Sequence, residues 1–375
     1  MRMLAAVSAL VLLAGCSGLE LTERALVLGA GLDLTEDGRV SLTAQFYKPG
    51  RTEAQSRGLR AFFNITTIGN SVFEAIRDIP LHLGRKAQWS HMQTIVVGER
   101  MAKSPRLAES LDFFFRDDEP RLTSRFVVAR GEAKSYLNKE PHIEKSVSRL
   151  LRNIQRTSNR ISGKTPDVTL LELEVALGSE TKTIVVPYAV PEAEMGDAPV
   201  FFGGAVIKNG RMIGRLSPQE VMYYLMLKNE FRSGIITVPC GEGKRHESLE
   251  VMKVKTKIMP AVRRDDLHVK IAMAVQGTVR ELTCSRTDSA GGVERYERKI
   301  AEVIEERLRR SIRAYERMKA DVIGIGNEVY KADPKTWRQW KEDWDERLQR
   351  IQYDFDIRVD VINEGLEEGK SVSEI

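Results

Sequence analysis

The sequence predicts an α+β fold of more than one domain, with antiparallel sheets flanked by helices and a long amphipathic helix in the C-terminal domain. Three observations carry this prediction. An Asp-Gly turn and several alternating runs are typical of hairpins, helical runs are mixed with strand-like runs along the whole chain, and 375 residues usually divide into two or three domains. The composition, 42% hydrophobic and 30% charged, is that of a globular protein.

The first residues predict the export signal of a lipoprotein. One arginine precedes an apolar run from Leu4 to Leu13, which is about half as long as a membrane-spanning helix. The run ends in Leu13-Ala14-Gly15-Cys16, which looks like the lipobox of bacterial lipoproteins. An ordinary secretory signal with a chance cysteine is the alternative. We expect residues 1–15 to be removed, so that Cys16 carries a diacylglyceryl thioether and an N-acyl chain such as palmitate. More than one acyl chain is what stable anchoring in a membrane requires.

The N-terminal region, residues 16–195, opens with a predicted hairpin. Two β-rich runs, Arg24 to Leu34 and Arg39 to Tyr47, flank an Asp-Gly turn, which is a strong hairpin signal. A polar loop over residues 48–58 follows. The other expected elements are helices near residues 72–79, 107–115, 132–137, 143–154 and 168–177, and strands over 94–97 and 124–129.

The main domain boundary is predicted between residues 187 and 200, because Pro187, Pro191 and Pro199 interrupt this segment. The region before the boundary is open to a division into two subdomains. The C-terminal domain then covers residues 200–370. It is expected to hold strands over 200–208, 235–238, 249–258, 267–275 and 355–361, a helix from Ser217-Pro218, and a long amphipathic helix over 293–322 packed on an antiparallel sheet.

Two motifs near the C-terminus invite a functional interpretation that the pattern does not favour. Gly324 and Gly326 resemble the start of a phosphate-binding loop, but Val329 stands at the third glycine position and a helix precedes them. We interpret them as glycines that end a helix. Trp337, Trp340 and Trp344 recur at helical spacing, which indicates a ridge facing the core.

Catalytic motifs are absent from the sequence: it contains no nucleophile elbow, zinc-protease motif or phosphate-binding loop. His91 is interpreted as a structural histidine, and Asp117-Asp118 beside Arg116 as a solvated turn. The net charge of +5, spread along the chain, suits anionic lipid headgroups better than nucleic acid.

Besides Cys16, the sequence holds only Cys240 and Cys284. An exported compartment allows them to form a disulfide, which requires a Cα separation of about 4.4–6.8 Å that the sequence does not give. Pairing and two free thiols both stay open. Neither cysteine has a CxxC partner or a histidine cluster nearby, so we expect no metal site and no cofactor.

Short segments spread over the chain resemble one known family. They are the lipobox, Gly31-Leu32-Asp33, residues 73–77, Trp89-Ser90-His91, residues 112–117, Arg121-Leu122-Thr123, residues 204–207, 214–217, 234–240 and 319–326. In this order they are similar, nearly end to end, to the Ger(x)C-type lipoproteins, which are the C subunits of spore germinant receptors. Ile323 and Ile325 depart from the aromatic residues expected beside the glycines.

The resemblance implies a non-enzymatic, lipid-anchored subunit on the outer face of the inner spore membrane. Such a subunit acts with an A subunit and an integral-membrane B subunit, and is needed for germination in response to nutrients. Only Cys16 carries over as a chemical site, and the segments around His91 and Arg116 are candidate interaction surfaces. The alternatives are a solute-binding lipoprotein of a transporter, which should show two lobes with parallel strands, and an anchored hydrolase, which needs a triad or metal cluster.

Overall fold

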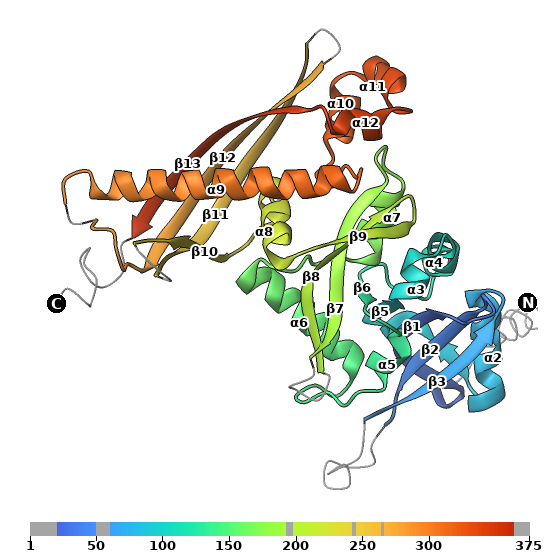
Figure 1. Cartoon of the computed structure of the whole chain (residues 1–375). Coiled ribbons are helices and arrows are strands. Elements are labelled where there is room, and N and C mark those ends of the chain that lie inside the picture. Colours follow the sequence, from blue (N-terminus) through green and yellow to red (C-terminus); the bar gives the residue numbers. More distant parts are fainter. Residues whose placement is uncertain are drawn as a thin grey trace, which may run out of the picture.

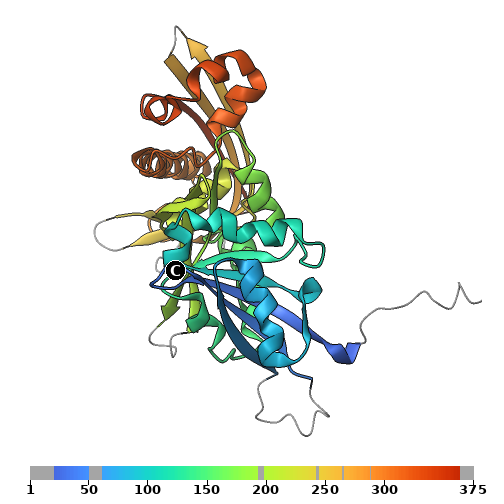
Figure 2. The ribbon, with the colours of Figure 1, turned by 90° about the vertical axis from the view of Figure 1, so that its right-hand side faces the viewer.

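The computed structural model describes residues 21–49, 61–192, 198–241, 245–263, 266–287 and 289–363. Two sheets flanked by helices make up the molecule, so the predicted α+β fold is confirmed (Figure 1). A view turned by 90° again places the second sheet at one end of the molecule and β1–β3 at the other (Figure 2). None of the helices in the described ranges combines the length and the hydrophobicity of a bilayer-spanning helix.

The large sheet holds nine strands in the order β3-β2-β1-β5-β6-β7-β8-β9, with β4 beside β1. Its strands are β1 (Arg24–Leu34), β2 (Val40–Tyr47), β3 (Phe62–Gly69), β4 (Lys86–Gln88), β5 (Thr94–Gly98), β6 (Arg125–Ala129), β7 (Thr183–Glu192), β8 (Ala198–Lys208) and β9 (Arg211–Leu216). The predicted β1–β2 hairpin is confirmed.

The centre of this sheet differs from the expected antiparallel pairing, because β1, β5, β6 and β7 run parallel. The connections from β5 to β6 and from β6 to β7 contain helices, which return the chain to the same end of the sheet. All five residues of β5 are buried, as are four of five in β6. Strands covered on both faces have continuous apolar runs of this kind, which are typical of parallel sheets.

Helices cover both faces of the large sheet. One face packs on α2 (Val72–Leu83), α3 (Glu99–Lys103), α4 (Arg106–Arg116) and α7 (Leu170–Leu177), and the other on α5 (Ala133–Leu137) and α6 (Val147–Ser162). The short helices η1 (Leu21–Glu23) and η2 (Trp89–His91) complete this part. Buried Asp33 of β1 accepts hydrogen bonds from the amides of Ala133 and Lys134, at 2.8 and 3.0 Å, and so fixes the start of α5.

The three prolines of the expected boundary lie within strands. Pro187 and Pro191 belong to β7 and Pro199 to β8, and these two strands are antiparallel neighbours. A register shift follows Pro187, which fits a residue that has no N–H to donate to the ladder. The chain leaves the large sheet only after Leu216, so the division into domains 16–195 and 200–370 stays a prediction about independent folding.

The second sheet has the order β10-β11-β12-β13. Its strands are β10 (Gly234–Pro239), β11 (His246–Arg263), β12 (Asp266–Glu281) and β13 (Gln352–Asn363), and its helices are α8 (Pro218–Leu227), α9 (Gly292–Arg317), α10 (Ile325–Ala332), α11 (Pro334–Trp340) and α12 (Trp344–Leu348). The predicted antiparallel pairing of the first three strands is confirmed, and β13 adds in parallel beside β12.

The long amphipathic helix is confirmed as α9. It buries Tyr296, Ile300 and Ile304 with the rest of its apolar face in one hydrophobic core shared with the sheet. The helix ends at Arg317, five residues before the predicted end, because Lys319 takes a left-handed φ of 50°. The tryptophans are buried as predicted, with the rings of Trp337 and Trp344 5.0 Å apart, although they lie on two short helices.

The interpretation of Gly324 and Gly326 as helix-ending residues is wrong, because they begin α10. The Asp321 carboxylate, only 3% exposed, accepts hydrogen bonds from the amides of Gly324, Ile325 and Gly326 at 2.8, 2.8 and 2.6 Å. Trp344 Nε1 lies 3.3 Å from the same carboxylate. Gly324 has a φ of 80°, a conformation in which glycine is unstrained. Burial raises the pKa of Asp321, against the opposing effect of these donors.

We predict that Asp321→Ala lowers the free energy of unfolding by about 3 kcal/mol or more, because buried N–H donors would lose a charged acceptor. Urea denaturation followed by circular dichroism measures the change. Asp333→Ala is the matched control: Asp333 caps α11 at the surface through the amides of Lys335 and Thr336, and such a cap contributes about 1 kcal/mol. Equal losses in the two variants would contradict the prediction.

Candidate functional site

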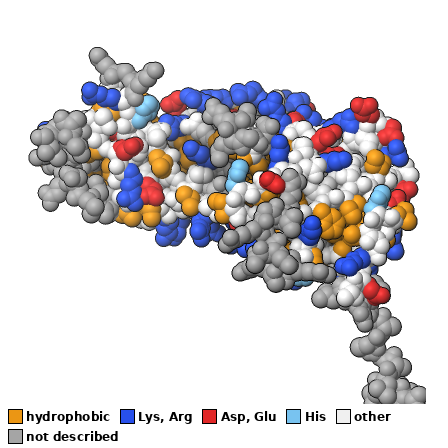
Figure 3. Space-filling view, turned by 90° about the horizontal axis from the view of Figure 1, so that it is seen from below, with side chains coloured by type: hydrophobic (Ala, Val, Ile, Leu, Met, Phe, Trp, Pro, Cys, Tyr) orange, Lys and Arg blue, Asp and Glu red, His pale blue; other side chains and the backbone are white. Residues whose placement is uncertain are grey.

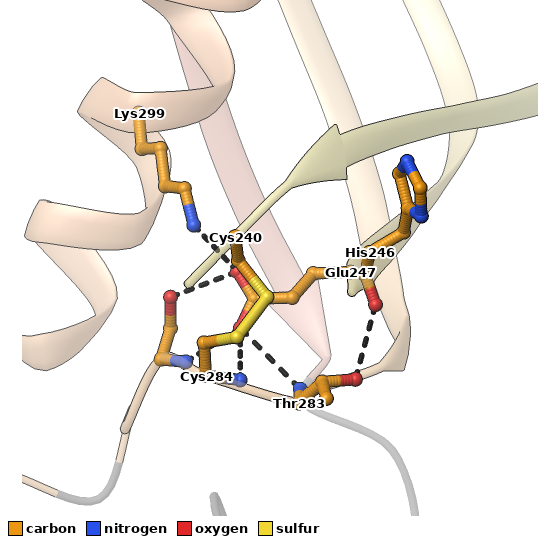
Figure 4. Close-up of a disulfide and its surroundings, with 7 residues drawn as sticks. Cys240, His246, Glu247, Thr283, Cys284 and Lys299 are labelled. Atoms are coloured by element: carbon orange, nitrogen blue, oxygen red, sulfur yellow. Dashed lines mark hydrogen bonds and ion pairs between the residues drawn. A yellow bond between two sulfur atoms is a disulfide. The ribbon is translucent and has the colours of Figure 1, made fainter. Parts of the chain in front are cut away.

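Of the residues singled out in the sequence, the structure brings Cys240 and Cys284 together. Cys240 follows β10, Cys284 follows β12, and both of these strands pair with β11. The structure joins the two sulfur atoms in a disulfide, with a Cα separation of 6.0 Å (Figure 4), inside the range that disulfides show. The bond therefore links the strands on either side of β11.

A buried carboxylate lies beside this disulfide. The side chain of Glu247, on β11, has no exposed surface and forms an ion pair of 2.8 Å with Lys299 of α9. Its oxygens also accept hydrogen bonds from the amides of Cys284 and Ser285, at 2.8 and 2.5 Å (Figure 4). We call Cys240, Cys284, Glu247 and Lys299 the disulfide cluster. It joins β10, β11, the end of β12 and α9 at one place.

Electrostatics favour the charged form of Glu247. Burial acts to raise the pKa of this carboxyl, but the Lys299 ammonium and the amides of Ser285 and Cys284 outweigh burial and hold the pKa below its usual value. The two cysteine sulfur atoms and a carboxylate oxygen of Glu247 lie within 4.8 Å of one another. Sulfur atoms bonded to each other are not the thiolates that bind a metal. The geometry is that of a covalent and ionic crosslink.

The two candidate interaction surfaces of the N-terminal region have different settings. His91 ends η2 and lines a pocket of about 460 Å³, together with Arg121, Arg125, Arg152 and Arg156 among others. Two of the segments that carry the family resemblance, around His91 and Arg121, thus meet at one pocket.

Arg116 is not part of that lining. It is exposed at the end of α4 and pairs with Asp112 at 2.7 Å. The neighbouring Asp117 carboxylate accepts a hydrogen bond from the amide of Glu119 at 3.0 Å, as expected of a turn. The predicted surface around Arg116 therefore consists of local ion pairs and turn contacts.

Sequence reasoning missed the arginines at 125, 152 and 156. Arg152 and Arg156 are one helical turn apart on α6, and that spacing was the available signal. Their meeting with Arg121 depends on how α6 packs across the sheet. The proposed lipidation site, Cys16, and most of the expected polar loop, from residue 50 on, lie outside the described residues.

Two family models match the chain in succession. One, described as the spore germination protein N-terminal domain, matches residues 17–191, and the other, described as spore germination B3/GerAC like, C-terminal, matches residues 202–365.

Individual proteins match nearly end to end. Spore germination protein B3 of Bacillus subtilis (strain 168) is 23% identical, over 95% of this chain and 96% of that protein. Spore germination protein KC of the same organism is 24% identical, over 89% of this chain and 88% of that protein. The crystal structure of the GerBC protein matches with a TM-score of 0.60 and 19% identity, over 89% of this chain and 97% of that one. This last match shows a shared fold.

We predict that the protein unfolded without reductant contains no titratable thiol from Cys240 or Cys284. Replacing both by alanine should lower the free energy of unfolding by about 4 kcal/mol, because the bond closes a loop between residues 44 positions apart. Thiol titration and urea denaturation measure the two effects. Adding reductant to the unmodified protein should reproduce the loss, whereas a reductant-insensitive protein with two free thiols would refute the bond.

The lowered pKa of Glu247 predicts a dependence of stability on pH. The folded state favours the carboxylate, so its stabilisation is complete above the usual pKa of 4.5 and is lost as the pH falls through the lower folded-state pKa. Glu247→Gln should therefore unfold more easily at pH 7 by about 2 kcal/mol or more.

Denaturation curves at several pH values test this dependence. The gap between Glu247→Gln and the unmodified protein should shrink below pH 4.5. Glu250→Gln on the same strand, at the partly exposed pair with Arg280, is the control and should change little. A gap that stays constant down to pH 3 would show that the charge of Glu247 contributes nothing.

Proposed function

Because this chain belongs to the GerAC-like family of spore germination proteins, we propose that it is a lipid-anchored, non-enzymatic C subunit of a nutrient germinant receptor. The resemblance inferred from its short segments is confirmed. The observation that supports the proposal most strongly is that both family domains follow one another over nearly all of the chain. The fold is also shared with the GerBC protein. In this proposal it acts with the A and B subunits on the outer face of the inner spore membrane.

The position of the family match supports the lipid anchor at Cys16. The N-terminal match begins at residue 17, directly after that cysteine. The first described helix, η1, begins at Leu21, and five residues span at most about 17 Å. Lipidation would therefore hold the start of β1 close to the membrane surface.

The surface near the start of β1 supports the same orientation. Arg24 of β1 lies opposite Lys86 in the parallel ladder of β1 and β4, and Lys86 comes shortly after α2. The exposed side of α2 carries Phe73 and Leu81, which are 49% and 82% exposed, and Arg77 stacks on Phe73 at 4.8 Å. Hydrophobic side chains also gather at the right-hand end of Figure 3, the end that holds β1–β3 and α2. Apolar and cationic groups together suit an anionic membrane surface.

The fold argues against the solute-binding alternative. Such a protein was expected to show two lobes with parallel strands. Here only the large sheet has a parallel centre, and the second sheet joins three antiparallel strands to one parallel edge strand. A single hydrophobic core also runs from the second sheet to residues of β7 and β8, so no cleft separates two lobes along this core.

We predict that Cys16→Ala removes the lipid from the mature chain and causes a nutrient-specific germination defect, which deletion of the gene causes at least equally. Mass spectrometry of the membrane-extracted protein detects the acyl groups, and dipicolinate release from dormant spores across a panel of nutrients measures germination. Ser17→Ala is the matched control and should keep both the lipid and the response. Deletion without any nutrient defect, in a strain with no second receptor for those nutrients, would sink the proposal.

A further inference from the structure

The pocket beside His91 has the position and size of a ligand site. It opens where β5 and β6 begin, and separate segments form it: the end of η2, the residues before β6, the first residue of β6, and α6. Its volume of about 460 Å³ falls among those of small-molecule sites, about 300–1,000 Å³. A bare inorganic ion would fill only part of it.

The charge in this pocket is strongly unbalanced. Arg125 pairs with Asp167 at 2.8 Å, with side chains 17% and 25% exposed. Arg121, Arg152 and Arg156 have neither an ion pair nor a side-chain hydrogen bond to any residue that the structure describes. The four guanidinium groups of the pocket thus have one carboxylate, that of Asp167, as an ion-pair partner among the described residues.

A second acid, Glu172, forms no ion pair with these four arginines. Glu172 acts on Asp167 electrostatically, but its carboxylate is held by the hydroxyl and amide of Thr169, both at 2.7 Å. Burial lowers the pKa of Arg152, and the charges of Arg156, Arg125 and Arg149 lower it further. Arg152 thus lies partly buried among like charges.

The pocket also holds neutral polar groups that could form hydrogen bonds with a ligand. The side-chain oxygen of Gln93 is buried and accepts no hydrogen bond from the described residues. Ser90 and Thr123 also line the pocket, and their hydroxyls have no hydrogen-bond partner in that same part of the chain. Buried polar atoms are normally paired, so the unpaired Gln93 oxygen beside these guanidinium groups indicates a site for a polar ligand.

We propose that this pocket binds an oxyanion, a phosphate or carboxylate group, carried by a small molecule or by a lipid headgroup. Guanidinium groups bind such oxyanions through paired, charge-assisted hydrogen bonds. Arg152 and Arg156 would bind the anion from α6 and Arg121 from the segment before β6, with Gln93 left for a donor elsewhere on the same ligand. This site does not depend on the receptor assignment, since it rests on the pocket alone.

Calorimetric titration of the mature, lipid-anchored chain in a non-ionic detergent tests the proposal. The probes are inorganic phosphate, acetate, and dihexanoyl phosphatidylglycerol, each compared with chloride at the same ionic strength, and the heat of mixing each probe with detergent alone is subtracted. Arg152→Gln and Arg156→Gln should each weaken binding by about tenfold or more, because each removes a hydrogen bond to a charged group. Arg160→Gln, exposed on the same helix and outside the pocket lining, is the matched control and should stay within about twofold.

The probes also distinguish the sources of the oxyanion. Tighter binding of the lipid than of phosphate or acetate, lost in Arg152→Gln, supports a headgroup, and the reverse order supports a soluble ligand. Arg152→Lys keeps the charge without the paired hydrogen bonds and should bind more weakly than the unmodified protein. Unchanged urea midpoints establish that the variants are folded. No binding of any probe, or equal binding by all variants, would overturn the site.

Discussion

The burial of α8 on all its sides is the constraint that holds the two sheets in one molecule. Every residue from Val221 to Leu227 is buried, and a helix that is apolar all round must be enclosed by other elements. Its core includes Val185 and Val206 of the large sheet, the inner residues of β11 and β12, and the apolar face of α9. Polar contacts secure it further, since Tyr315 donates to the Glu220 carbonyl and Thr256 to that of Met226, at 2.7 and 2.8 Å.

Elements with a strong local signal could be predicted from the sequence. The Asp-Gly turn gave the β1–β2 hairpin, Ser217 and Pro218 gave the start of α8, and the three–four spacing gave α9. Pairing between distant strands left no such signal, so the parallel centre of the large sheet was missed. Prolines and glycines misled for the same reason. Pro187 and Pro199 are accommodated inside strands by the register of β7 and β8, and the role of Gly324 depends on Asp321 reaching back to three amides.

Candidate sites followed the same rule. Two cysteines suggested a disulfide. The two residues come together only because β11 lies between the strands that precede them, and no local sequence pattern predicts that arrangement. The ionic half of the disulfide cluster, Glu247 with Lys299, was missed altogether, because a glutamate in an alternating strand looks solvated until α9 covers it. Arg121 was noted only as part of a segment that carries the family resemblance. Its part in the pocket appears when α6 brings Arg152 and Arg156 to the starts of β5 and β6.

Helix α6 connects the pocket beside His91 physically to the second sheet. It carries Arg152 and Arg156 at the pocket and is capped by Gly163, where a Cβ would lie 2.3 Å from the Phe231 ring and 2.8 Å from the Ser233 carbonyl. Those residues lead directly into β10, whose first residue, Gly234, packs against the Ser162 carbonyl with equally little room. The far end of β10 is fixed by the Cys240–Cys284 bond. Close packing leaves little freedom for α6 to move alone. A displacement of α6 would therefore also displace β10, which is held at both ends.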